Sequence, residues 1–228
     1  MTMARGARRS IACLLVSAGL AVSSMSNAQQ FSADLVAVRG DKTEHIGSLR
    51  VAGGKARIES YQLSDGFFLI DPAKPAAYFV RPRAHVFMDA RQSSSLTQMF
   101  VPVDPDEPCA QWHAMASLAA SIEARPIDAT SWRCERDGEG TIGGRRMDVY
   151  RIVGTSGSSF VGWVDRERRF PLQIKVADGT MILVDSIRDA PQSAQSFDIP
   201  PGVQKFDPQA LIRRIQQSDV WVAPPGSE

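Results

Sequence analysis

The chain has 228 residues, a formal net charge of +1 and 43% hydrophobic residues. This length is sufficient for one domain with a sizeable core. The nearly neutral charge argues against a nucleic-acid partner, which would require a strongly basic surface.

The first 28 residues have the pattern of a cleaved secretory signal. Three arginines precede an apolar run at residues 11–22, and Ser26-Asn27-Ala28 places small residues before a cleavage point. The run is shorter than the roughly 20 residues of a membrane-spanning helix. We therefore expect residues 1–28 to be removed and the mature protein to be exported and soluble. The arginine-rich composition then indicates the periplasm of a Gram-negative bacterium.

From residue 31 onward, apolar and polar residues alternate with the period of two that is typical of strands. Gly53-Gly54 and Asp178-Gly179 indicate tight hairpin turns. Connections this short favour antiparallel pairing, because parallel strands need long crossovers. The expected strands contain Val36/Val38, Leu49/Val51, Ala56/Ile58, Phe67/Leu69, Tyr78/Val80 and Val86/Met88 in the first half, and lie near 146–154, 159–165, 170–177 and 180–188 in the second.

Two helices are expected in the middle of the chain and one near its end. Residues 93–100 favour a short helix, and the proline- and acid-rich stretch 103–109 has the composition of a helix start. Asp207-Pro208 is a favourable start for the last helix. We expect the main domain at 29–206 and an amphipathic helix with a flexible tail at 207–228. The apolar helix faces consist of Trp112, Met115, Ala116, Ala119 and Ile122 in mid-chain, and of Leu211, Ile212 and Ile215 near the end.

Removal of the signal leaves two cysteines, Cys109 and Cys134. An even number of cysteines in an oxidising compartment predicts a disulfide. It would join the mid-chain helix to the next strand and stabilise the fold by roughly 3 kcal/mol on the chain-entropy model. A metal site or a redox pair is the alternative, although neither cysteine lies in a C-x-x-C and only His113 is near them.

Motifs for catalysis or nucleotide binding are weak. Residues 138–143 spell G-x-G-x-x-G, but a strand pattern follows where dinucleotide binding requires a helix. We therefore expect a β-turn there. Ser156 lacks a nucleophile-elbow pattern, and His45, His85 and His113 lack metal-ligand spacing. We expect a protein that is not an enzyme and uses no metal or other cofactor, although a triad can assemble from distant residues.

The densest run of charges comprises Asp165, Arg166, Glu167, Arg168 and Arg169, between two strand-like segments. Charges at a hairpin turn are solvated and discourage association between sheet edges. We expect all five side chains to lie in such a turn. Replacing the three arginines with serine should then leave the fold intact.

Four phrases together resemble the LolA/LolB-like periplasmic lipoprotein-carrier superfamily, and more narrowly its outer membrane lipoprotein-sorting protein-like members. They are GSLRVAGGKARIE (47–59), GEGTIGGRRMDVYRI (138–152), GWVDRERRFPLQIK (162–175) and SFDIPPGVQKFD (196–207). The cysteine pair resembles the narrower group. The resemblance covers about residues 31–207.

The resemblance implies an α+β, mostly β fold: a curved antiparallel sheet forming an open half-barrel, with a few short helices over its concave face. In the carriers, an apolar cavity between sheet and helices receives acyl chains, and an early arginine latches the helical lid. Arg57 is the nearest equivalent of that arginine. The residues expected to line the cavity are Phe67, Tyr78, Phe87, Trp112, Met115 and Trp163.

The leading functional hypothesis is a monomeric, non-catalytic periplasmic binding or carrier protein for the acyl chains of a lipoprotein or lipid. The alternative is an envelope sensory or interaction module of the same fold that transports no cargo and binds an inner- or outer-membrane protein. A hydrolase is the third hypothesis. An open space beneath Trp112 and Met115 favours the carrier, and a filled space favours the module.

Overall fold

A computed structural model describes residues 30–90, 94–122, 132–154 and 159–207, excluding the side chains of 118–122. Within these residues, twelve strands form one sheet in the order β12-β6-β5-β4-β3-β2-β1-β11-β10-β9-β8-β7. All neighbouring strands are antiparallel except β12 and β6, which are parallel. The expected signal at 1–28 and the helix expected after Asp207 lie outside the described residues.

The first half of the chain forms a meander. Gly53 and Gly54 have positive φ angles of 57° and 73°, as the tight turn between β2 and β3 requires. Short 3₁₀ helices follow β3, β5 and β11. The strands are β1 (Phe31–Arg39), β2 (Lys42–Ala52), β3 (Lys55–Ser60), β4 (Phe67–Asp71), β5 (Ala76–Arg81) and β6 (Val86–Asp89), and the 3₁₀ helices are η1 (Tyr61–Leu63), η2 (Pro82–Ala84) and η3 (Ala194–Phe197).

The second half forms another meander, whose last long strand pairs with β1 and so joins both halves into one sheet. Its strands are β7 (Arg133–Ile142), β8 (Arg145–Val153), β9 (Phe160–Asp165), β10 (Phe170–Val176) and β11 (Met181–Asp189), followed by the two-residue β12 (Gln204–Lys205). The two ends of the sheet, β12 and β7, do not pair, so the sheet is open.

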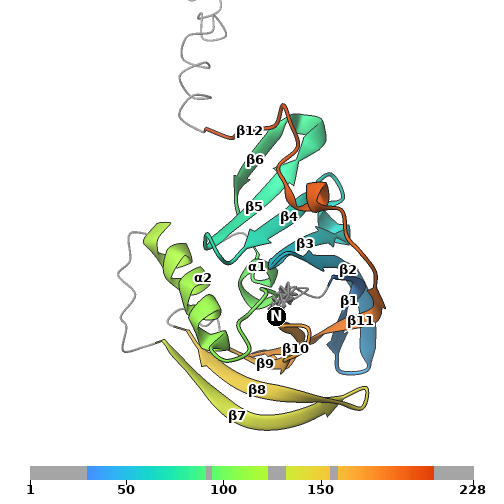
Figure 1. Ribbon diagram of the computed structural model, residues 1–228, viewed down its shortest axis with the longest axis vertical. Coiled ribbons are helices and arrows are strands. Elements are labelled where there is room, and N and C mark those ends of the chain that lie inside the picture. Colours follow the sequence, from blue (N-terminus) through green and yellow to red (C-terminus); the bar gives the residue numbers. More distant parts are fainter. Residues whose placement is uncertain (1–29, 91–93, 123–131, 155–158, 208–228) are drawn as a thin grey trace, which may run out of the picture.

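Two helices lie inside the curve of the sheet: α1 (Leu96–Met99) and α2 (Pro108–Ile122) (Figure 1). They close the main hydrophobic core, to which nearly every long strand contributes. Its fully buried large residues include Phe31, Leu35, Leu49, Ile58, Phe68, Ile70, Phe100, Met115, Phe170 and Ile174. The expected curved antiparallel half-barrel with a few short helices on its concave face is therefore confirmed.

The disulfide between Cys109 and Cys134 is confirmed, with a Cα–Cα distance of 5.7 Å. It joins the first turn of α2 to the edge strand β7. Because the two cysteines are 25 residues apart in the chain, the bond fixes one end of α2 against a strand that is distant in sequence.

The charged turn is only partly as expected. Residues 166–169 form the turn between β9 and β10, but Asp165 is 3% exposed and Arg168 is 6% exposed. The Asp165 carboxylate accepts the backbone N–H groups of Glu167 and Arg168 at 2.9 and 3.1 Å, and it accepts Arg145 at 3.1 Å. The expectation that all five charges are solvated is therefore wrong for these two residues.

Arg168 is held by Asp189 of β11, to which both terminal guanidinium nitrogens donate. Its guanidinium carbon lies 5.4 Å from the centroid of the Phe31 ring, within cation–π range. The hydrogen bond from Arg168 lowers the pKa of Asp189 below its ordinary value. The turn is therefore tied to β1 and β11, and the triple serine replacement should not leave the fold intact.

We predict that the double variant Cys109→Ser/Cys134→Ser loses about 3 kcal/mol of unfolding free energy. The reason is that no disulfide then closes the loop between the two cysteines, which are 25 residues apart, in the unfolded state. Urea denaturation followed by circular dichroism measures the loss. Reduced wild-type protein is the control and should match the variant. Equal stability of oxidised wild type and variant would contradict the prediction.

We predict that Arg168→Met destabilises the protein by about 2–3 kcal/mol at neutral pH, because it leaves Asp165 and Asp189 without their shared cation. The expected destabilisation is smaller than for a fully buried ion pair, because the Asp189 side chain is 53% exposed. Arg169→Ser, at a neighbouring exposed position, is the matched control and should change stability by less than about 0.5 kcal/mol.

The effect of Arg168→Met should depend on pH. The folded pKa of Asp189 is lowered, so its contribution is complete above the unfolded value of about 3.9 and is lost as the pH falls through the folded value. Denaturation curves at a series of pH values should thus show the two proteins converging in acid. A constant difference down to the acid limit would argue against this pairing.

Candidate functional site

The seven residues expected at a ligand cavity occupy three separate places in the structure. Trp112 and Met115 lie in the main core beneath α2. Phe67, Tyr78 and Phe87 belong to a second, smaller apolar cluster, and Arg57 lies over the Phe67 ring. Trp163 lies beside Val149 on β8 and Gly140 on β7. These residues therefore do not line a single cavity.

Trp112 fills the space between α2 and the sheet. Its indole N–H donates to the carbonyl oxygen of Met99 at 3.1 Å, and its ring meets Tyr150 and Phe160 edge to face. On the sheet, Gly162 makes room for the indole: a Cβ added there would lie 3.1 Å from the Trp112 ring. Trp112 is 2% exposed and Met115 is fully buried. The space beneath these two side chains is filled.

The second cluster lies on the outer face of β4–β6 and is covered by a C-terminal strap, which we define as residues 190–206. Phe67, Leu69 and Val80 alternate with core residues along their strands, so they point away from the helices. Ile199 and Val203 of the strap pack on them, and Figure 1 shows the strap passing along this side of the sheet. The strap ends in β12, which pairs with β6.

Arg57 holds the strap in place. Its Nη1 donates to the carbonyl oxygen of Ser196 at 3.1 Å, and its guanidinium carbon lies 3.6 Å from the centroid of the Phe67 ring. Burial lowers the pKa of Arg57, against the attraction and hydrogen bond of Glu59. Because the helices lie on the other face of the sheet, Arg57 anchors the strap and does not latch a helical lid.

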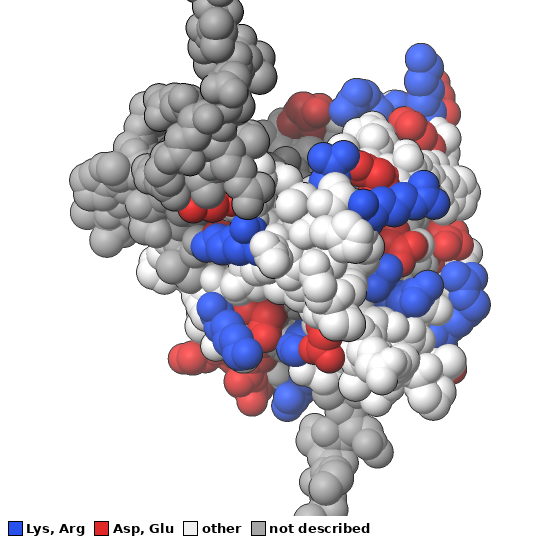
Figure 2. Space-filling view, turned by 90° about the horizontal axis from the view of Figure 1, so that it is seen from above, with Lys and Arg blue, Asp and Glu red and all other residues white. Residues whose placement is uncertain are grey.

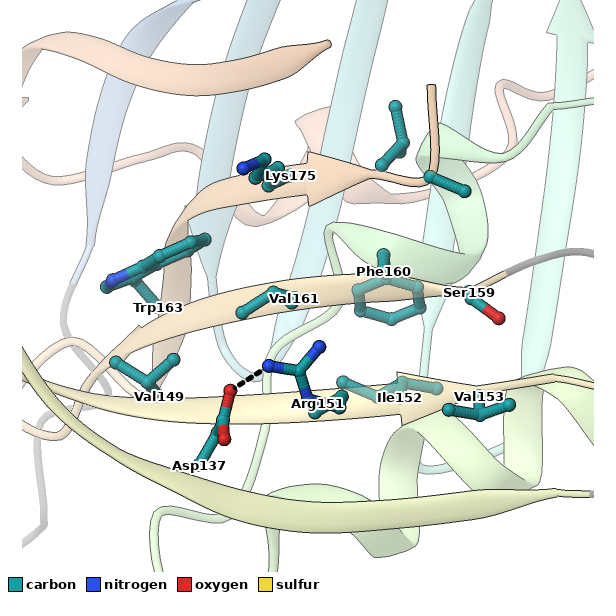
Figure 3. A pocket seen from close by; sticks show the side chains of 12 residues that line it. Asp137, Val149, Arg151, Ile152, Val153, Ser159, Phe160, Val161, Trp163 and Lys175 are labelled. Carbon is teal, nitrogen blue, oxygen red and sulfur yellow. Dashed lines mark hydrogen bonds and ion pairs between the residues drawn. The ribbon is translucent and has the colours of Figure 1, made fainter. Parts of the chain in front are cut away.

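The third place is a groove on the outer face of β8–β10, with a volume of about 400 Å³ (Figure 3). Gly162 faces Trp112 inside, so its neighbours Val161 and Trp163 point outward. We call this feature the outer groove. It is lined by Asp137, Val149, Arg151, Ile152, Val153, Ser159, Phe160, Val161, Trp163, Lys175, Val176 and Ala177.

The side chains of the outer groove stand in rows across the three strands. Arg151 pairs with Val161 and Val161 with Lys175, so one row carries a cation on each side of an apolar residue. The next row contains Val149, Trp163 and Gln173. Arg151 is bonded to Asp137, whereas the Lys175 ammonium forms no ion pair within the described part of the chain.

Of the residues in this groove, Trp163 alone is among those expected from the sequence. In the sequence, the only trace of the groove is an alternation of apolar and cationic residues, as in Val149-x-Arg151-x-Val153. An alternation of this kind usually indicates an ordinary solvent face, so nothing in it distinguishes a groove from a flat surface.

The remaining charged residues near the turn form a structural network. Asp148, with a 6% exposed side chain, accepts Arg136 at 2.6 Å and Arg166 at 2.9 Å, and Arg166 also bonds to Asp106 at 2.9 Å. Burial raises the pKa of Asp148, but the hydrogen bonds from the two arginines outweigh it and the net pKa is lowered. On the face in Figure 2, Lys and Arg are interspersed with Asp and Glu. In this network the arginines neutralise the carboxylates, so none of these four residues is free to act as a general acid or base.

The other motifs also have structural places. The G-x-G-x-x-G residues lie mainly in β7, and the turn follows at Gly143-Gly144, so the expected β-turn begins only at the end of the motif. Ser156 lies outside the described residues. All three histidines are exposed: His45 lies on β2, His113 on α2, and His85 between η2 and β6. Within the described chain, no cluster of three or more His, Cys, Asp or Glu could hold a metal ion.

Among the described helices, none has the length and apolar character needed to cross a membrane.

No family model matches the chain, and no curated protein matches it. Similar solved structures include an uncharacterized conserved protein from Thermus thermophilus, with a TM-score of 0.43 and 10% identity, covering 79% of this chain and 91% of that one. The LolA superfamily protein NE2245 from Nitrosomonas europaea has a TM-score of 0.33 and 11% identity, covering 75% and 89%. For MucB in the Pseudomonas aeruginosa MucA/MucB complex, the TM-score is 0.37 and the identity 13%, and the match covers 78% of this chain but only 58% of that one. At these identities and TM-scores the matches carry no conclusion about the activity of this chain.

We predict that Arg57→Met loosens the strap, because it removes the hydrogen bond to Ser196 and the cation over Phe67. Amide hydrogen exchange in residues 194–206 should accelerate, while the loss of global stability stays near 1 kcal/mol. Arg50→Met, on the neighbouring strand β2, is the control and should leave exchange in the strap unchanged. Unaltered exchange in Arg57→Met would contradict the anchoring role.

Proposed function

We propose that the mature chain is a periplasmic, non-catalytic binding module that acts through its outer surface and encloses no cargo beneath α2. The observation that carries this proposal is the position of Trp112, whose side chain occupies the space that an acyl chain would need. A filled space is the feature that favours a sensory or interaction module over a carrier.

Several observations support a module without chemistry of its own. The three histidines are exposed in separate parts of the fold, and arginines bind the carboxylates near the charged turn. General acid–base catalysis needs groups that converge on a reacting atom. The periplasmic location rests on the export pattern of residues 1–28.

The exposed edge of the sheet supports a monomer. Strand β7 carries charged side chains and a bulge at Gly138, whose φ is 130°. Both features discourage another strand from pairing at an edge. The charged residues of this strand are Arg133, Glu135, Arg136, Asp137 and Glu139.

A carrier for acyl chains is the second candidate, and the apolar concave face beneath α2 favours it. Displacing the indole would cost on the order of 3–5 kcal/mol, the usual effect of removing a core tryptophan. Burying an acyl chain stabilises the complex by about 0.8 kcal/mol for each CH₂. A long chain can therefore offset the opening of α2, so the two candidates must be separated by experiment.

The test asks whether an acyl chain reaches Trp112. In the variant Trp132→Phe/Trp163→Phe/Trp221→Phe, Trp112 is the remaining tryptophan and its emission can be excited selectively. We predict that dibromostearate, whose bromine atoms quench indoles on contact, leaves its emission unchanged, because the side chain is enclosed. Unchanged circular dichroism establishes that the variant is folded.

Saturable quenching of Trp112 in the folded variant would overturn the proposed module and establish the carrier. Iodide, which is excluded from apolar interiors, is the matched control and should not quench in either case.

A further inference from the structure

We infer that the outer groove binds a long-chain fatty acid anion, with its carboxylate between Arg151 and Lys175 and its chain over the apolar side chains. The inference deepens the proposed function, on which it rests, by naming a ligand for the outer surface.

The floor of the outer groove is apolar along two neighbouring strands, β8 and β9. Trp163 is half-buried and flanks Val149, while Val161 occupies the centre of the groove and Val153 the end away from Trp163 (Figure 3). A volume of about 400 Å³ lies within the range of small-molecule sites. The groove thus offers one elongated apolar surface that the strap and helices leave uncovered.

The cations are placed for one anion. Arg151 and Lys175 flank Val161 on its two neighbouring strands. Strands two apart are separated by roughly 9–10 Å, so both long side chains can reach an oxyanion held above Val161. Asp137 is bonded to Arg151, and Glu135 of β7 stands opposite it in the same row, so the carboxylate of the ligand pairs mainly with the Lys175 ammonium, which has no ion pair in the described part of the chain. A single carboxylate matches that charge.

The occupant is an acyl chain in preference to a peptide. Strands β8, β9 and β10 each pair with a neighbour on both sides, so their main-chain groups are already engaged. A peptide laid over them could not add as a strand and would bury its own N–H and C=O groups without partners. An acyl chain has no such groups. One groove of this size and one ammonium without an ion pair in the described chain fit a single-chain anion.

The experiment measures quenching of Trp163 by dibromostearate below its micellar concentration. Trp132→Phe/Trp221→Phe serves as the parent protein, in which Trp112 and Trp163 emit. We expect saturable quenching in the parent and its loss when Trp163→Phe is added. Lys175→Glu should weaken binding by about tenfold or more, the effect of losing one hydrogen bond to a charged group.

Lys42→Glu is the matched control, since it makes the same charge change at an exposed position at the start of β2. It should bind as the parent does. The methyl ester of dibromostearate, which lacks the anion, should bind about tenfold more weakly than the acid.

Three results would overturn the inference. Absence of saturable quenching in the parent would exclude a fatty acid ligand. Equal binding by Lys175→Glu and Lys42→Glu would exclude the cation row as the anion site. Quenching that persists after Trp163→Phe would place the chain against Trp112, and would overturn the proposed module as well. The first two results leave the closed interior, and hence the proposed module, standing.

Discussion

Both faces of this sheet carry apolar side chains, and the way each face is covered determines what the molecule can bind. A strand presents successive residues to opposite faces. The apolar residues between the core positions therefore lie on the outer face, where another segment must cover them or they stay exposed. The helices α1 and α2 cover the concave face, and the C-terminal strap covers the outer face of β4–β6. Over β8–β10 the outer face has no such cover among the described residues, and this is where the outer groove lies.

The segment Val161-Gly162-Trp163 links the two faces. Gly162 lets Trp112 pack closely on the sheet, because a Cβ at this position would lie 3.1 Å from the ring. Since the neighbours of an inward residue point outward, the same segment presents Val161 and Trp163 to the outer groove. The close packing of α2 therefore also determines which side chains form the outer surface. A large side chain at position 162 would displace the Trp112 ring and so disturb the packing of α2.

The sequence allowed the strands, the two mid-chain helices and the disulfide to be predicted, because each depends on local periodicity or on composition. It did not reveal which aromatic residues face inward. In Phe67-Phe68-Leu69-Ile70 every residue is apolar, so the sequence does not tell which alternate pair faces the core. The contacts with the strap show that Phe67 and Leu69 face outward. The burial of Arg168 depends on Asp189 and Phe31, which no local pattern connects with the turn.

The described restraints on α2 lie near its N-terminal end, and their magnitudes indicate which ones matter most. The Arg166–Asp106 pair joins the β9–β10 turn to the segment before α2, but both side chains are more than half exposed, so it contributes at most about 1 kcal/mol. The disulfide and the buried Trp112 each contribute several times more. They act on neighbouring turns of the helix and on different strands, β7 and β9. Opening the interior at this end would have to overcome both, whereas binding in the outer groove disturbs neither.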